Sequence, residues 1–290
     1  MMERVLLIAR NVFRGILHRR VLYLWIAAIG LLILRSLPAI FFNFGSEALQ
    51  TVMRQRAVSG ALDTWSTLCI ALAIFMGASA IGSEISTKTI VSVFARPIRR
   101  WEFLLGKWIG VQAFAMLSLV LGLLVGLAVG TYLDANFEYK ILGVSIAQTT
   151  VAIALYSGIA IALSTVAGSG LAGALAVLIA FMPGLVTYLM DSSNSVNHAV
   201  GVALNLVVPP GYTSHYDATV DAPIPLEAFT MGRGRPNRRG GVPPFMAQQT
   251  VDADIDYDSE VSTLVKNGLY AAVFVVLGCV VFSRRELRLA

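Results

Sequence analysis

Six long apolar stretches, separated by polar segments, run along the chain. A helix needs about 20 mostly apolar residues to cross the ~30 Å hydrocarbon core of a bilayer, and these stretches have about that length. They cover residues 21–42, 64–82, 108–131, 141–164, 171–190 and 267–283. The pattern predicts an all-α polytopic membrane protein with six transmembrane helices, and it places the whole chain, residues 1–290, in one transmembrane domain.

Residues 3–19, ahead of the first stretch, have the period of an amphipathic helix. One face is polar and mostly basic, with Arg4, Asn11, Arg14 and His18, and the other is apolar, with Val5, Ala9, Val12, Phe13 and Ile16. A helix of this kind suits the membrane interface. Residues 1–20 are therefore predicted to form an N-terminal interfacial amphipathic helix. An ordinary basic flank of the first span is the alternative.

The composition supports the membrane assignment. Hydrophobic residues make up 57% of the 290 residues and charged residues 13%, against about 25% charged residues in soluble domains. The mean hydropathy is +0.73. These values exclude disordered, collagen-like and disulfide-rich secreted chains, and they argue against a soluble enzyme.

The positions of Lys and Arg predict the orientation. With the N-terminus inside, the short inner segments (1–20, 83–107, 165–170 and 284–290) carry 13 Lys and Arg residues, whereas the longer outer segments (44–61, 132–140 and 191–266) carry 8. Cytoplasmic loops collect Lys and Arg. Both termini are therefore predicted to be cytoplasmic, in a plasma membrane (the inner membrane of a bacterium).

The connection 191–266 is the only sizeable polar part, and the orientation predicts it to be extracytoplasmic. Its residues 194–208 are apolar but too short to span, and the half from 211 to 262 is rich in Gly, Arg and Asp. The acidic run 252–260 has the alternation of a calcium loop, but Tyr257 and Thr263 replace the turn Gly and the bidentate Glu that such a loop needs. A solvated loop is the simpler interpretation, both for this run and for the Arg cluster at 233–239.

No pattern in the chain predicts catalysis or a metal site. The only Gly-Lys pair, Gly106-Lys107, is followed by Trp108, so there is no phosphate-binding loop. Cys69 and Cys279 both lie inside apolar runs, and the three histidines match no metal-ligand spacing. We expect no catalytic residue, no metal and no cofactor bound by this chain itself.

Two features inside the spans concern packing and charge. Gly122, Gly126 and Gly130 line one helix face, which allows close approach of a second helix, within one subunit or across a dimer. Arg35 lies about 21 Å into the first span, where an unpaired charge is costly. We expect it to pair with Asp63 at the outer boundary of the second span. Solvation of Arg35 by lipid headgroups is the alternative.

The segment between the second and third spans carries the most information. It reads GSEISTKTIVSVFARPIRRWEFLLGKWIG over residues 82–110. It resembles the cytoplasmic loop of permease subunits of type-2 ABC exporters in Glu84, Thr89, Arg96, Pro97, Arg99, Arg100, Gly106 and Lys107. The layout of an N-terminal amphipathic helix, six spans and a large fifth connection extends the resemblance to most of the chain. The Gly/Arg/Asp-rich half of that connection departs from the pattern.

The physical properties of the segment suit coupling to a soluble partner. Pro97 disfavours helix at the residues just before it, which predicts two short pieces within the loop 84–102. The apolar residues of the first piece, Ile90, Val91, Val93 and Phe94, would enter a groove on the partner, and Arg99 and Arg100 would lie at its rim. A basic loop that only sets the topology is the alternative.

The resemblance implies a membrane-spanning permease that forms the translocation path of an ATP-driven exporter. Two copies of a separate ABC ATPase subunit would bind ATP and Mg²⁺, and this chain would pair with itself or with a related permease in the lipid bilayer. Nucleic acid is not expected as a partner. Two other classes stay open: a secondary transporter driven by an ion gradient, and a non-transporting membrane anchor of a larger assembly.

Overall fold

The computed structural model describes residues 2–17, 30, 47–86, 99–132, 137–192, 195–205, 208–212, 215–216 and 257–284. This part of the chain contains helices and no β-strand. The helices are α1 (Met2–Leu17), α3 (Glu47–Ser86), α5 (Arg100–Tyr132), α6 (Tyr139–Ser164), α7 (Ser169–Met190), α8 (Ser195–Asn205) and α10 (Tyr257–Arg284). An all-helical chain is expected in a bilayer, because a helix satisfies its own backbone hydrogen bonds where no water can.

Among the described residues, five helices are long and apolar enough to cross a membrane: α3 from Arg54 to Gly82, α5, α6, α7 and α10. They correspond to five of the six predicted spans. The sixth, predicted at 21–42, lies outside the residues that the structure describes. The chain is thus a multi-pass membrane protein.

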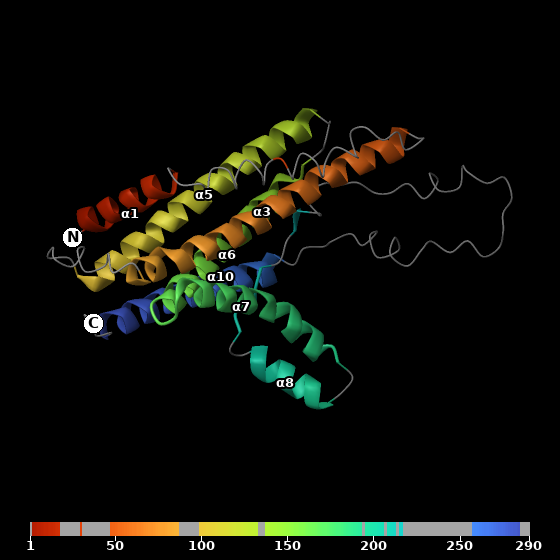
Figure 1. The fold of residues 1–290 in the computed structure, drawn as a ribbon. Coiled ribbons are helices and arrows are strands. Elements are labelled where there is room, and N and C mark those ends of the chain that lie inside the picture. Colours follow the sequence, from red (N-terminus) through yellow and green to blue (C-terminus); the bar gives the residue numbers. More distant parts are fainter. Residues whose placement is uncertain are drawn as a thin grey trace.

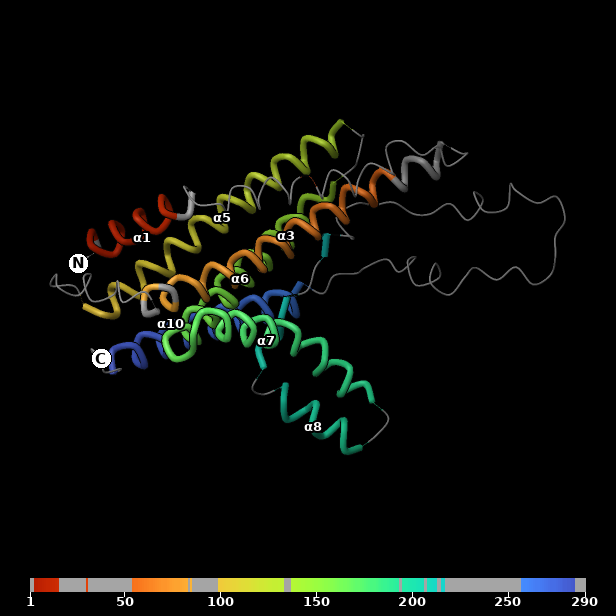
Figure 2. Tube along the Cα trace, in the orientation of Figure 1, coloured from red at the N-terminus to blue at the C-terminus, as the bar shows by residue number. Residues whose placement is uncertain are grey.

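Helices α3 and α6 form the centre of the bundle (Figure 1). The most apolar window of each is 61% buried, whereas the windows of α5, α7 and α10 are only 17–33% buried. These outer helices cover the central pair. The first half of α7 packs on α3 and α6, and its second half diverges from the bundle together with α8 (Figure 2). The N-terminus and the end of α10 lie at one end of the bundle, together with the last turn of α3 and the first turn of α5. We call this the proximal end and the opposite one the distal end.

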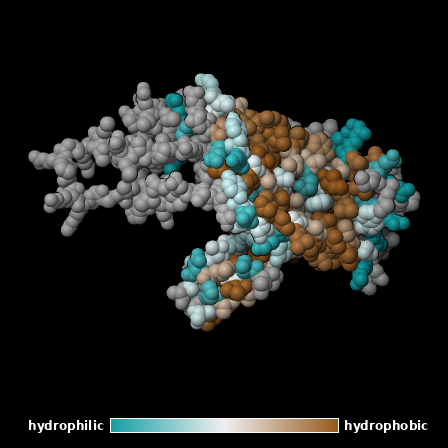
Figure 3. Space-filling model, turned by 180° about the vertical axis from the view of Figure 1, so that it is seen from behind, coloured by the Kyte–Doolittle hydropathy of each residue, from teal (hydrophilic) through white to brown (hydrophobic). Residues whose placement is uncertain are grey.

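The body of the bundle presents an apolar surface to its surroundings. Hydrophobic residues cover most of the visible body, and hydrophilic residues lie at both of its ends, one of which holds the two termini (Figure 3). Large apolar side chains such as Leu124, Leu178, Phe181 and Val276 are 55–76% exposed. Such a surface would be unfavourable in water, and it suits contact with lipid tails.

Several helices are longer than the apolar stretches that predicted them. α3 begins at Glu47 rather than at residue 64, α5 at Arg100 rather than at 108, and α10 at Tyr257 rather than at 267. Hydropathy finds only the part of a helix that contacts lipid, whereas backbone hydrogen bonding continues into polar sequence that favours helix. Asp258 and Glu260, which we expected in an acidic loop, therefore lie in the first turn of α10. Acidic side chains are favourable there because a helix N-terminus is partly positive.

Glycines lie at the contacts between helices. A Cβ on Gly122 would overlap the indole of Trp65, and one on Gly126 would overlap Leu62, both on α3. A Cβ on Gly130 would meet Val58 of α3 and the ring of Phe137. The Trp65 indole is buried and donates a hydrogen bond to the backbone oxygen of Ser118 at 3.0 Å. The glycine stripe of α5 therefore packs within this subunit, against α3.

The apolar face of α1 packs against α5. A Cβ on Gly106 would come within 2.7 Å of Ile8, and one on Gly110 within 2.8 Å of Val12. The rings of Phe13 and Phe114 meet edge to face at 6.1 Å. Along these contacts the residue numbers increase together on both helices, so α1 runs parallel to the start of α5. The predicted amphipathic helix is thus present, and its apolar face packs on α5; its place in the membrane interface stays a prediction.

We expect Gly122→Leu to destabilise the bundle, because the added side chain has no space beside Trp65. Overpacking of this kind typically costs about 1–3 kcal/mol. The purified variant should unfold at a lower temperature in detergent than the parent protein. Gly143→Leu on α6 is the matched control, since nothing lies within 4 Å of a Cβ at that position. Equal melting temperatures for the two variants would contradict the α3–α5 contact.

Candidate coupling site

The two helices that flank segment 87–98 are joined by an ion pair at the proximal end. The Nζ of Lys107, in the second turn of α5, lies 2.5 Å from the Oε1 of Glu84, in the last turn of α3. The side chains are 12% and 26% exposed, respectively. Fully exposed ion pairs contribute only about 0–1 kcal/mol. Removal of one partner here would leave a mostly shielded charge, which is more costly.

Lys107 has a second favourable contact within α5. Its Nζ lies over the ring of Phe103, 5.4 Å from the ring centroid, within the range of a cation–π interaction. Phe103 is buried and stacks on Phe282 of α10, with ring centroids 6.3 Å apart. The ammonium group is thus held between a carboxylate and an aromatic ring, which fixes the level of α5 relative to α3.

The first turn of α5 is closed by its own side chain. The backbone N–H of Arg99 donates to the Oε2 of Glu102 at 3.1 Å, and the N–H of Phe103 donates to the Arg99 oxygen at 3.2 Å. Glu102 is therefore the acidic half of a capping box, at the third helical position. It is only 3% exposed. This cap defines where segment 87–98 ends and the rigid helix begins.

Arg100 connects the start of α5 to the end of α10. Its Nη1 donates to the backbone oxygen of Ser283 at 3.4 Å. The last carbonyl groups of a helix have no partner within the helix, and a cation beside them is favourable. The first turns of α5 thus contact α1, α3 and α10. We call Glu84, Arg100, Glu102, Phe103 and Lys107 the coupling base.

The predicted coupling residues fall into two groups. Glu84, Arg99, Arg100, Gly106 and Lys107 lie together at the two ends of the 87–98 segment. Gly106 is in the second turn of α5, where it packs on α1 rather than preceding the span. Thr89, Ile90, Phe94, Arg96 and Pro97 lie outside the described residues, as does Arg35. Its expected partner Asp63 is half-buried on α3, and the Arg35–Asp63 pair stays a prediction.

Sequence reasoning missed some contacts of this site. Glu102 was a recognisable signal, because an acidic residue in the first turn of a helix is typical of a cap. The Glu84–Lys107 contact had a weaker signal, namely opposite charges at the two ends of one loop. The contacts of Arg100 and Phe103 with α10 had none, because they join residues more than 170 positions apart in the sequence. The arrangement has no reacting groups, and among the described residues no cluster of His, Cys, Asp or Glu could hold a metal ion.

Comparison with known proteins agrees with this architecture. The model of the family described as ABC-2 family transporter protein matches residues 6–287. No curated protein matches the chain. The family match covers nearly the whole chain, including the five described helices that can span a membrane and the coupling base between them. This chain belongs to the ABC-2 family of transporter proteins, as a membrane-spanning permease of an ABC transporter.

Proposed function

We propose that this chain forms the translocation path of an ATP-driven exporter and receives mechanical force from a separate ATPase subunit through residues 84–102. The family supports an ABC transporter permease. The contacts of the coupling base support the second part of the proposal, namely the transfer of force. Residues 87–98 begin and end at helices joined by the Glu84–Lys107 ion pair. A push on the segment therefore acts on several helices at once rather than on a loose loop.

The base can transmit force because its contacts join the first turns of α5 to three other helices, and the Glu84–Lys107 and Phe103–Phe282 contacts are mostly shielded from solvent. Lys107 links α5 to α3. Phe103 and Arg100 link α5 to α10, and α1 packs on α5 at Gly106. An ATPase that binds Ile90 and Phe94 would move these helix ends together. Packed helices move as rigid bodies more readily than they deform. ATP-driven closure of the ATPase would thus change how the spans pack further along.

The partners follow from this proposal. ATP and Mg²⁺ bind to the ATPase, two copies of which serve a pair of permeases, either two copies of this chain or this chain and a relative. The proximal end, with α1 and the basic residues around α5, faces the cytoplasm, in agreement with the distribution of Lys and Arg. The complex then resides in the plasma membrane, and the large connection after α8 lies outside.

Labelling at the two ends of α6 tests the orientation. Tyr139 is 77% exposed at the distal end, and Val166, just after α6, is 66% exposed at the proximal end. In a background without Cys69 and Cys279, we expect Tyr139→Cys to react with an impermeant maleimide in intact cells or spheroplasts. Val166→Cys should react only after lysis. The reverse pattern would contradict cytoplasmic termini.

Affinity purification from native membranes tests the partner. We expect a stoichiometric ATPase to co-purify with the wild-type chain. Phe94→Ala should reduce this ATPase several-fold, because loss of an apolar anchor costs an interface more than loss of a rim charge. Arg99→Ala should have a milder effect that depends on salt. Undiminished recovery with Phe94→Ala, in protein that inserts normally, would leave 87–98 as a loop that only sets topology.

A charge exchange tests the coupling base. We expect Glu84→Gln and Lys107→Gln each to lower the permease-dependent ATP hydrolysis of the reconstituted complex, because either change removes the charge–charge contact between α3 and α5. The double exchange Glu84→Lys with Lys107→Glu should recover much of it. Lys140→Gln, an exposed lysine at the distal end of α6, is the control. Additive losses with no recovery would show that the pair does not couple α3 to α5.

A further inference from the structure

A short segment after α8 runs back along the bundle and contacts four of its long helices. We call its described residues, 208–212 and 215–216, the strap. Pro209, Gly211 and Tyr216 are buried, although the strap belongs to the connection between α8 and α10. Tyr216 is fully buried within the main apolar cluster. The strap is therefore part of the packed core and not a surface loop.

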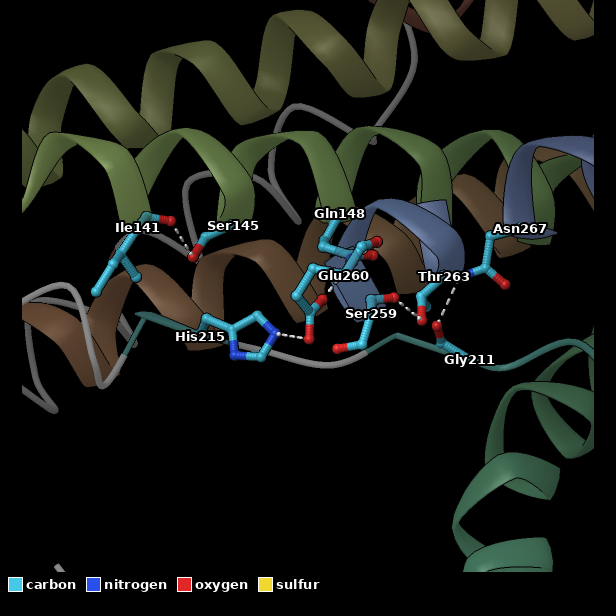
Figure 4. Close-up of polar contacts among 9 residues, drawn as sticks. All are labelled: Ile141, Ser145, Gln148, Gly211, His215, Ser259, Glu260, Thr263 and Asn267. Carbon is cyan, nitrogen blue, oxygen red and sulfur yellow. Dashed lines mark hydrogen bonds and ion pairs between the residues drawn. The ribbon is translucent and has the colours of Figure 1, made fainter. Parts of the chain in front are cut away.

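The strap is attached to α10 at two points (Figure 4). The Nε2 of His215 lies 3.0 Å from the Oε1 of Glu260, a close charge contact that lacks the geometry of a hydrogen bond, and the Nδ2 of Asn267 donates to the Gly211 oxygen at 2.8 Å. Asn267 is 1% exposed, so its amide is buried and holds the strap backbone by this hydrogen bond. Gly211 has a φ of +89°, a conformation that favours glycine. This turn directs the Gly211 carbonyl to Asn267.

Glu260 also binds α6, on the side opposite the strap. The Nε2 of Gln148 donates to the Oε2 of Glu260 at 2.6 Å, and Gln148 is 1% exposed. One carboxylate thus joins α6, α10 and the strap. Next to it, the Thr149 hydroxyl lies 3.3 Å from the Tyr216 hydroxyl. Burial raises the pKa of Tyr216, and Ser66 of α3 and Thr149 beside it lower that pKa in part. The phenol therefore stays protonated.

The remaining contact is with α7. A Cβ on Gly211 would come within 2.6 Å of the ring of Pro183, in the second half of that helix. The strap therefore lies against α7 at Pro183, against α10 at Glu260 and Asn267, against α6 at Thr149 and near α3 at Ser66. These are the helices that would have to separate if a path opened between them.

The depth of the cluster places it near the boundary of the bilayer. Glu260 precedes Ser283 by 23 positions, or about 34 Å of helix at ~1.5 Å per residue. A hydrocarbon core is ~30 Å thick. With Ser283 at the proximal boundary of the hydrocarbon core, Glu260 and His215 would lie close to the distal headgroups, where a charged side chain is tolerated and water is within reach.

We propose that the strap is a gate that closes the distal end of the translocation path, with Glu260 as its latch. This rests on the proposed function as an exporter. The contacts that hold the strap to α10 and α6 are mostly polar, so water can replace them when the strap moves. Gln148 Oε1 and Asn267 Oδ1 have no hydrogen-bond partner in the described structure, although both side chains are buried. Such atoms gain partners when water or cargo enters, which makes the closed state reversible.

Cysteine accessibility beneath the strap tests the gate. Thr149 is fully buried in the closed structure. In a background without native cysteines, Thr149→Cys should react slowly with a small impermeant thiosulfonate in intact cells or spheroplasts. With Glu260→Ala or His215→Ala added, the reaction should be about tenfold faster, since either change removes the partly buried contact between the strap and the Glu260 carboxylate, which is worth roughly a factor of ten in an opening equilibrium. Ser262→Ala, an exposed position on the same helix, is the matched control and should change nothing.

The outcomes separate the gate from the exporter. Equal rates with and without Glu260→Ala and His215→Ala would overturn the latch. Tyr139→Cys, measured in parallel, should react in every variant; its failure would show wrong insertion or wrong orientation and would count against the proposed function. His215→Ala carries the test if Glu260→Ala does not insert, because His215 lies outside the spans. In the purified complex with its ATPase, ATP should also speed the reaction of Thr149→Cys. No effect of ATP, with a fast reaction in the variants, would support the latch and contradict the ATP-driven mechanism.

Discussion

Close approach of helix backbones at glycine is the contact on which the rest of this bundle depends. In a bilayer the hydrophobic effect does not drive helices together, because lipid tails are as apolar as leucine side chains. Shape and backbone proximity must do so instead. A Cβ added to Gly77 of α3 would lie 2.9 Å from the Ser157 oxygen on α6. A Cβ added to Gly278 of α10 would lie 3.2 Å from Ala162 on α6. Gly106 and Gly122 allow the same close approach of α5 to α1 and α3.

The helices at the centre of the bundle are held together by close packing at glycine. Polar contacts between helices lie mainly at three positions along the bundle axis. The coupling base lies at the proximal end and the strap at the distal end. Between them, Gln112 on α5 donates to the Ser157 hydroxyl of α6 at 2.5 Å, and the Trp108 indole donates to the same hydroxyl at 3.1 Å. Polar groups at membrane depth are costly unless they are paired, so such clusters mark positions where two helices must keep one register.

The same helices take part at both ends. α10 carries Phe282 at the coupling base and Glu260 at the strap, and α3 carries Glu84 at the base and Ser66 beside Tyr216. A rigid helix that is attached to the coupling base at one end and to the strap at the other moves these two sites together. Under the proposed function, this geometry connects the site of ATP-driven force to the exit of the path, without requiring a chain of side-chain rearrangements through the core.

Periodicity and composition alone determined the fold class, the approximate positions of the five spans that the structure describes and the helix at the N-terminus. The resemblance of segment 82–110 indicated the transporter family, which the family match confirms. These features depend on the length of apolar runs and on short local motifs. Both are properties of residues that are close together in the sequence. The tertiary structure decided that the apolar face of α1 packs on α5, that the glycine stripe of α5 packs on α3, and that Glu84 meets Lys107. It alone brought His215, Gln148 and Glu260 together. Their separation along the chain leaves no local pattern, and each side chain by itself is typical of a polar boundary residue. Only the packing of α3, α6, α7 and α10 places them in contact, because that packing sets which helix faces meet and at what depth.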